Sequence, residues 1–324
     1  MRLTAQRAWQ RWKTRRLKLC FAIAASANDG FYGQIAMFRR SLDYLGGIYK
    51  RAAVIATFGD QTIRELPDRW QPHFDRIITH FVPPASSQGP DDHFAQSFAK
   101  WTNIPDECDF VVFSDADTIV LRPLDNLLNL LVAAPSVAGT IAHWTPFHFE
   151  DVDPREEWAA LARECLGREI PLDYTHTFTT DKDPPSLRKC PFYLNFGCVI
   201  VPRKLLDPIR STYLPLLSRV LPLLRNPSFT AQVSLTLAVY AHRTPHQAVD
   251  MRYNFPNDEL AEALYAESLQ DVRVIHYLRT QRFDRQQIFA SAEGFDSFLK
   301  LNLRGSNKVF QDHVRILTDS RYPF

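Results

Sequence analysis

The sequence predicts an α/β fold in which a mostly parallel β-sheet is covered by helices on both faces. In the first third of the chain, apolar runs of strand length alternate with segments of helical periodicity. Clusters of polar residues follow two of these runs, at Asn28-Asp29 and at Asp115-Ala116-Asp117. The apolar content of 45% and the charged content of 23% are typical of a globular protein with a buried core.

The N-terminal half supplies the elements of this sheet in order. Residues 19–25 form an apolar run of strand length, and the turn signal Asn28-Asp29-Gly30 follows. Residues 31–45 are predicted to be a helix that ends at Gly46-Gly47. A further helix is expected over residues 94–104, and further strands over 52–57, 76–81 and 110–113. Parallel strands end at one edge of the sheet, where ligands bind, so both polar clusters are expected there.

The C-terminal half is less regular. A capping box at Asp153, with proline at the next position, predicts a helix from 154 to about 165 that Gly167 ends. Another helix is expected from Asp207-Pro208, and Pro215 and Pro222 should kink or break it. Ser228 is expected to cap a helix that runs to about 241. Strands are predicted over 192–201, 248–253 and 272–277, and a loop over 175–186.

Residues 1–18 form a basic N-terminal extension, with seven basic residues and no acid, whereas the rest of the chain has 31 basic and 36 acidic residues. With Trp9 and Trp12, the extension is suited to an anionic membrane surface, and a solvated tail is the alternative. Basic residues before the apolar stretch 19–27 resemble a signal peptide, but this stretch is short and serves better as a strand. We expect residues 19–324 to form one domain with an insertion at about 140–190.

Composition also bounds the location and the partners of the protein. No apolar run reaches the roughly 18 residues that a bilayer span requires. The five cysteines are scattered and show no CxxC spacing, which favours a reducing compartment. We therefore expect a cytoplasmic protein, with peripheral membrane contact through residues 1–18 and no nucleic-acid partner.

Asp115 and Asp117 directly follow a buried strand. Two close carboxylates repel each other unless a cation or a partner compensates them, and oxygen ligands suit Mg²⁺ or Mn²⁺ bridging a diphosphate. A solvated acidic turn is the alternative. His276 ends a later strand and completes a mixed ligand set that suits Mn²⁺, although a structural histidine is the alternative. The cationic cluster downstream suits a diphosphate leaving group, or is a solvated basic face. It consists of Arg279, Arg282 and Arg285.

These segments resemble the glycogenin-like family 8 of retaining glycosyltransferases. The stretch 110–125 (FVVFSDADTIVLRPLD) is similar to the metal-binding segment of that family, and residues 21–45 to its first strand, nucleotide turn and helix. The similarity covers about 19–285. Four other matches follow in the same order: Tyr193-Leu194-Asn195-Phe196-Gly197 in the strand that faces the donor sugar, Ala231-Gln232 at the Asp-Gln position, Tyr253-Asn254, and His276-Tyr277-Leu278 with Arg282.

The resemblance implies a GT-A fold and sugar transfer, with retention, from a nucleoside-diphosphate donor, usually a UDP-sugar. The acceptor is an unidentified saccharide, lipid or protein. Mn²⁺ (or Mg²⁺) would be held by Asp115, Asp117 and His276. The other implied roles are contact with the base by Asn28, Asp29 and Phe31, contact with the donor by Lys100, contact with the diphosphate by Arg282, and catalytic contact with the sugar by Asn195 and Gln232.

Three departures from the family pattern leave alternatives open. Ala231 replaces a carboxylate, which leaves both the stereochemistry and the activity open, so a catalytically inactive sugar-nucleotide-binding protein is the first alternative. Arg279 and Phe283 replace glycine and proline, so the loop over the diphosphate is expected to differ in shape. A haloacid-dehalogenase-type phosphatase is a further alternative, although Ile119 stands where it needs Thr or Val. A second metal site or an acceptor cleft would explain one further polar cluster. It consists of His143, His148, Glu150 and His176.

Overall fold

The computed structural model describes residues 16–59, 62–63, 65–82, 100–147 and 153–324. Its central sheet has seven strands in the order β10-β6-β9-β4-β1-β2-β3. The predicted mostly parallel sheet is confirmed, because only β9 runs antiparallel to its two neighbours, β4 and β6. The strands are β1 (Leu19–Ser26), β2 (Ala53–Gly59), β3 (Ile78–Val82), β4 (Phe110–Ser114), β6 (Val137–Ile141), β9 (Leu194–Pro202) and β10 (His246–Ala248).

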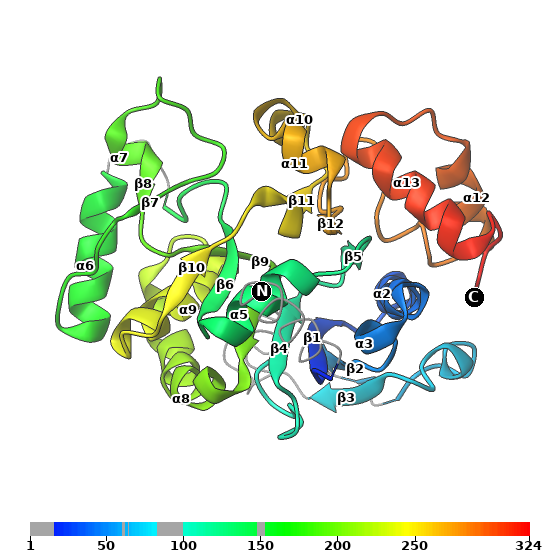
Figure 1. Ribbon diagram of the computed structural model, residues 1–324, viewed down its shortest axis with the longest axis horizontal. Coiled ribbons are helices and arrows are strands. Elements are labelled where there is room, and N and C mark those ends of the chain that lie inside the picture. The colour runs from blue at the N-terminus through cyan, green and yellow to red at the C-terminus, as the bar shows by residue number, and fades with distance from the viewer. Residues whose placement is uncertain (1–15, 60–61, 64, 83–99, 148–152) are drawn as a thin grey trace, which may run out of the picture.

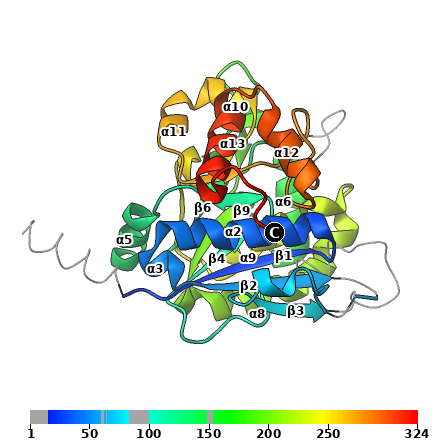
Figure 2. The same cartoon turned by 90° about the vertical axis from the view of Figure 1, so that its right-hand side faces the viewer.

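Helices cover both faces of this sheet (Figures 1 and 2). Alternate side chains of a strand point to opposite faces, so β4 sends Val112 into one core and Val111 into the other. The first core includes side chains of α2 (Asp29–Leu45) and α5 (Asp125–Ala133), and the second includes side chains of α6 (Pro154–Leu166), α8 (Arg203–Val220) and α9 (Thr230–Ala241). The α/β class predicted from the sequence is confirmed.

A small second sheet contains His276, the last of the three predicted metal ligands along the chain. Its order is β11 (Phe255–Pro256), β12 (Val274–His276) and β5 (Thr118–Val120), and β12 runs antiparallel to β5. A third core joins this sheet to two helices that were not predicted from the sequence, α12 (Ala292–Lys300) and α13 (Gly305–Thr318). Figure 1 shows these helices above α2, and Arg40 of α2 donates a hydrogen bond to the Leu317 carbonyl (2.6 Å).

Several local predictions needed correction. The helix expected from Asp207 begins at Arg203 and continues through Pro208 and Pro215. Ser228 does not cap α9, because it lies in the 3₁₀ turn Pro227–Phe229, which Asn226 caps. The strand expected over 248–253 was wrong, because β10 ends at Ala248 and the 3₁₀ turn Met251–Tyr253 follows it. The helix expected over 94–104 lies largely outside the described residues, and residues 100–104 are not helical.

The helix signals around α6 were correct. Asp153 accepts a hydrogen bond from the Arg155 backbone N–H (2.9 Å), and Gly167 ends the helix at a φ of 69°. No helix of the described residues has the length and apolar character needed to cross a bilayer. The remaining short elements are α3 (Gly47–Lys50), 3₁₀ turns at Gln71–His73 and Leu221–Leu223, β7 (Tyr174–Thr175), α7 (Pro185–Arg188), β8 (Lys189–Cys190), α10 (Glu259–Leu264) and α11 (Ala266–Gln270).

Candidate active site

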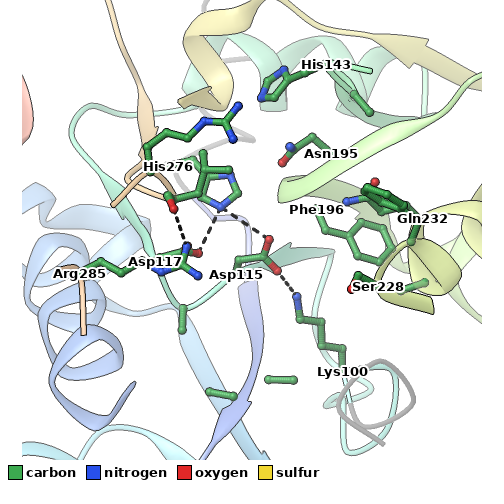
Figure 3. Close-up of a pocket in the computed structure, with 18 of the residues that line it drawn as sticks. Lys100, Asp115, Asp117, His143, Asn195, Phe196, Ser228, Gln232, His276 and Arg285 are labelled. Carbon is green, nitrogen blue, oxygen red and sulfur yellow. Dashed lines mark hydrogen bonds and ion pairs between the residues drawn. The ribbon is translucent and has the colours of Figure 1, made fainter. Parts of the chain in front are cut away.

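A cavity of about 460 Å³ lies beyond the carboxyl ends of β1 and β4, the sheet edge expected from the sequence. Figure 3 shows its polar side chains pointing toward one another from separate parts of the chain. Seven residues predicted from the sequence line it, and these are Phe31, Lys100, Asp115, Asp117, Asn195, Gln232 and His276.

The pairing of β12 with β5 brings the histidine to the two aspartates. His276 stands opposite Thr118, the first residue after the Asp-Ala-Asp turn. Its Nε2 atom lies 3.1 Å from Asp117 Oδ1 and 3.7 Å from Asp115 Oδ2. Two hydrogen bonds hold the turn, because the Tyr277 N–H donates to the Asp117 carbonyl (2.9 Å) and Thr118 Oγ1 donates to the Asp115 carbonyl (2.7 Å).

Two cations from distant segments pair with the aspartates. Lys100 Nζ lies 2.5 Å from Asp115 Oδ1, and the Arg285 guanidinium forms an ion pair with Asp117. Burial by itself would raise the pKa of Asp117, but His276 and Arg285 outweigh burial and lower that pKa to about 2. Asp117 is therefore ionised at neutral pH, as a metal ligand must be.

Arg285 reaches the cavity because its loop packs closely on α2. A Cβ atom at Gly30 would lie only 2.7 Å from the Gln286 carbonyl oxygen, so this approach requires glycine. Gln34, which is fully buried in α2, donates to the Arg285 carbonyl (3.0 Å), and Arg285 itself donates to the Leu278 carbonyl (3.0 Å).

The three predicted ligands fit a divalent cation. Their ligand atoms all lie within 4.8 Å of one another. Oxygen ligands about 2.1 Å from a shared Mg²⁺ stand roughly 3 Å apart at octahedral angles, close to the separation of His276 Nε2 from Asp117 Oδ1. Two carboxylates and one imidazole are also a donor set that Mn²⁺ accepts.

The opposite wall of the cavity carries two amide side chains, and the described residues add no further acid to it. Asn195 Oδ1 accepts hydrogen bonds from the Gly197 N–H (2.9 Å) and from Asn254 Nδ2 (2.8 Å), so the Asn195 amide nitrogen remains available as a donor. Gln232 and Ala231, from the first turn of α9, also line the wall. Among the described residues that line the cavity, the only carboxylates are those of Asp115 and Asp117.

Three predicted residues lie outside this lining. Asn28 caps α2 by accepting from the Phe31 N–H (3.1 Å), and Asp29 accepts from Trp70 Nε1 (2.7 Å). The side chain of Arg282 is 61% exposed and pairs with Glu259 at 2.5 Å. Arg279 and Arg285 line the cavity in its place.

His143 belongs to the cavity lining, whereas His176 is buried outside it. His143 stacks on Phe178 with 4.1 Å between ring centroids, and its Nδ1 lies 2.9 Å from Thr177 Oγ1. Burial lowers the pKa of His143 to about 3 and that of His176 to about 4, so both rings are neutral at physiological pH. Neither joins a second metal-binding group among the described residues, and His148 and Glu150 lie outside them.

Sequence reasoning missed several cavity residues. Tyr193 lies in the quoted family segment, but no role was expected for it, and its ring is fully buried in the cavity wall. Trp144, from a loop without periodic cues, and Phe229, from the 3₁₀ turn Pro227–Phe229, also line the cavity. An aromatic residue next to His143 was the one visible signal for Trp144.

Comparisons with known proteins found no matching family model and no matching curated protein. Among solved structures, the galactosyltransferase LgtC in complex with donor and acceptor sugar analogues matches with 13% identity and a TM-score of 0.47, over 82% of this chain and 88% of that chain. Mouse xyloside xylosyltransferase 1 matches with 13% identity and a TM-score of 0.47, over 83% and 99%. The bifunctional glycosyltransferase WbbM matches with 12% identity and a TM-score of 0.44, over 81% and 46%. At these low values, function has to be inferred from the site itself.

Proposed function

We propose that the chain is an enzyme that binds a nucleoside diphosphate through a divalent cation. The supporting observation is the convergence of Asp115, Asp117 and His276 in a cavity that also holds three cationic side chains. A metal beside several cations complements the charge of a diphosphate. The cationic side chains are those of Lys100, Arg279 and Arg285.

Within this class we propose a glycosyltransferase that uses a nucleoside-diphosphate sugar, with a UDP-sugar as donor and Mn²⁺ or Mg²⁺ as the metal. The amides of Asn195 and Gln232 face the metal ligands across the cavity (Figure 3). Amide groups are suited to hydrogen-bond the hydroxyl groups of a sugar. Phe31, at the start of α2, offers an aromatic ring beside the nucleotide position proposed for Asn28 and Asp29.

The residues of the site suggest how transfer proceeds. A bound divalent cation would stabilise the charge that develops on the departing diphosphate. Arg279 and Arg285 place guanidinium groups where phosphate oxygens can be contacted in pairs. Sugar transfer passes through an oxocarbenium-like state. Because the described lining offers no carboxylate beyond Asp115 and Asp117, retention would require the acceptor to attack from the same face that the diphosphate leaves.

A second candidate is a sugar-nucleotide-binding protein without activity. One specific observation favours it: Ala231 lines the wall beside Gln232 and presents only a methyl group there. Metal-dependent nucleotide binding is common to both candidates, whereas turnover of the donor belongs to the enzyme alone.

Replacement of Asp117 tests the metal-binding half of the proposal. We expect wild-type protein to bind UDP far more tightly with Mn²⁺ than without it, and Asp117→Ala to weaken the Mn²⁺-dependent binding by about 100-fold or more, since a ligand and its charge are lost. Isothermal titration calorimetry measures both, and circular dichroism checks the fold. Asp312→Ala, at an exposed ion pair of α13, is the matched control. Unchanged UDP binding by Asp117→Ala would contradict the metal assignment.

Turnover assays separate the alternatives. Mn²⁺-dependent hydrolysis of a UDP-sugar by wild-type protein supports the transferase. Metal-dependent binding without hydrolysis or transfer supports the inactive binding protein. Mg²⁺-dependent release of phosphate from phosphomonoesters, with no UDP binding, would instead support a phosphatase of the haloacid-dehalogenase type.

A further inference from the structure

Behind the proposed metal ligands lies a group of buried polar atoms that the mechanism above does not use. His276 directs Nε2 toward the two aspartates, and its ring is only 4% exposed. The other ring nitrogen, Nδ1, is buried and has no hydrogen-bond partner among the described residues. A buried imidazole nitrogen without a partner is energetically costly, so its surroundings should contain a group that complements it.

Asn254 supplies such a group. Its side chain is 1% exposed, and its Nδ2 atom donates to Asn195 Oδ1 (2.8 Å) and to the Asn195 carbonyl (3.4 Å). These two bonds fix the orientation of the amide, because only the nitrogen end can donate. The Asn254 Oδ1 atom is therefore turned away from Asn195, and it too is buried and has no partner in the part of the chain that the structure describes.

Gly197 shows that these two atoms border the same space. A Cβ atom at Gly197 would lie 2.3 Å from Asn254 Oδ1 and 2.3 Å from His276 Nδ1. The two atoms are therefore at most twice that distance apart, and both border the position that a side chain at residue 197 would occupy. One is a carbonyl oxygen, and the other is a ring nitrogen that can carry a proton, so they form a complementary pair.

We propose that Asn254 is a positioning residue for the metal site: its Oδ1 accepts a hydrogen bond from the Nδ1–H of His276 and keeps the Nε2 lone pair directed at the cation. A small rotation of the imidazole into the space above Gly197 closes this bond. The tautomer of a metal-binding histidine is set by the partner of its other ring nitrogen, and loss of that partner typically weakens metal binding 10- to 100-fold.

The same side chain connects the two walls of the cavity. Asn254 donates to the side-chain oxygen of Asn195, which lines the cavity, and this leaves the Asn195 amide nitrogen available as a donor. One asparagine thereby orients a metal ligand on β12 and a proposed sugar-binding amide on β9. This inference rests on the proposed metal-dependent function. It adds Asn254, which has no part in the mechanism proposed above.

Two substitutions at Asn254 separate its acceptor from its donor. We expect Asn254→Leu, which has a similar volume and no polar atom, to weaken the binding of Mn²⁺ alone by about 10- to 100-fold. Asn254→Asp keeps an acceptor for the Nδ1–H, so its Mn²⁺ affinity should stay within a few-fold of wild type. Titration calorimetry without nucleotide measures this affinity. Asn307→Leu is the control, because this buried asparagine of α13 accepts from Asn257 (2.9 Å) and does not line the cavity.

A second measurement needs no Asn254 variant. In ¹⁵N spectra of histidine-labelled wild-type protein, with His276→Gln used to identify the signal, we expect the His276 Nδ1 atom to bear a proton protected from exchange with water. This should hold both without metal and with diamagnetic Zn²⁺. An unprotonated Nδ1 in wild-type protein, or equal Mn²⁺ affinities of Asn254→Leu and wild type, would overturn the proposal. If wild-type protein binds no divalent cation, the proposed function fails, and the Nδ1 signal still decides the role of Asn254.

Discussion

Each aspartate of the candidate site is paired with a cation from a separate part of the chain. Lys100 contacts Asp115, and Arg285 contacts Asp117, which is only 7% exposed. Arg285 therefore holds Oδ2 of a carboxylate whose other oxygen, Oδ1, faces His276 and the proposed metal position. A cation bound between the aspartates competes with the guanidinium, and a displaced guanidinium would be free to contact phosphate oxygens.

Substitution of Arg285 should thus have opposite effects on the affinity for Mn²⁺ alone and on the affinity for UDP in the presence of Mn²⁺. We expect Arg285→Gln to strengthen the binding of Mn²⁺ alone by a few-fold, because a competing cation is removed. We expect it to weaken UDP binding in the presence of Mn²⁺ by about 10-fold or more, because a charge-assisted phosphate contact is lost. Titration calorimetry with each ligand measures the two effects.

Arg282→Gln is the matched control on the same loop. The exposed ion pair of Arg282 with Glu259 is expected to contribute under about 1 kcal/mol to the free energy of unfolding. Since Arg282 does not line the cavity, the affinities for Mn²⁺ and for UDP should both stay near those of wild type. A loss of UDP binding as large as that of Arg285→Gln would favour the role that family resemblance gives to Arg282. The sequence predicted the arginine cluster but not which of its members line the cavity, since residues 279–285 contain no helix or strand that would fix the side-chain directions.

At the scale of elements, α8 runs through Pro215, which was expected to kink or break it, and through Pro208, which was expected near its start. Pro208 and Pro215 both lie on its exposed side. The carbonyls that lose a hydrogen bond, four residues earlier, belong to Lys204 and Ser211, which are also exposed, so water can replace the missing donor. The opposite side of α8 is buried in the core through Leu206, Ile209, Tyr213, Leu216, Leu217 and Val220. Tertiary packing therefore outweighs the local cost of the prolines.

Replacement of Pro215 should reveal that cost. A proline inside a helix is about 3 kcal/mol less favourable than alanine, and its rigidity in the unfolded chain offsets part of this. We expect Pro215→Ala to raise the free energy of unfolding by about 1 to 3 kcal/mol, as measured by urea denaturation. Ser218→Ala, at an exposed position in the same helix, should change it by less than about 0.5 kcal/mol. A destabilised Pro215→Ala protein would show that the proline has a packing role.

At the scale of the whole molecule, the fold buries neutral histidines in more than one region. Burial lowers the pKa of His313, in α13, to about 4, and the nearby Arg122 adds to this effect. His143 and His176 are buried next to the end of β6, where His176 Nδ1 lies 3.2 Å from the Ala142 carbonyl, and their pKa values are lowered as well. Each folded-state pKa lies below the usual value of about 6.5, so the unfolded chain takes up protons first as the pH falls.

The stability should therefore be retained above about pH 6.5 and should fall as the pH drops from there toward the folded-state pKa values. Each such histidine contributes up to roughly 1.4 kcal/mol per pH unit to this loss. We expect His313→Gln to lose about 1 to 2 kcal/mol less stability than wild type between about pH 7 and pH 5, as measured by urea denaturation at both values. His242→Gln, at a more accessible histidine, is the comparison. Equal losses in wild type and His313→Gln would contradict a buried neutral His313.

The sequence by itself determined the α/β class and the strand that leads into Asp115 and Asp117, and a strand-ending position together with the family resemblance singled out His276 as their partner. These features follow from local patterns: continuous apolar runs mark buried strands, and close carboxylates need a compensating cation. Tertiary structure alone decided that Arg285 rather than Arg282 faces Asp117, and that Asn254 lies behind His276. Both outcomes depend on segments that meet only after folding, through the pairing of β12 with β5 and through the space above Gly197. Side-chain direction in irregular segments is set by such packing, which sequence spacing does not encode.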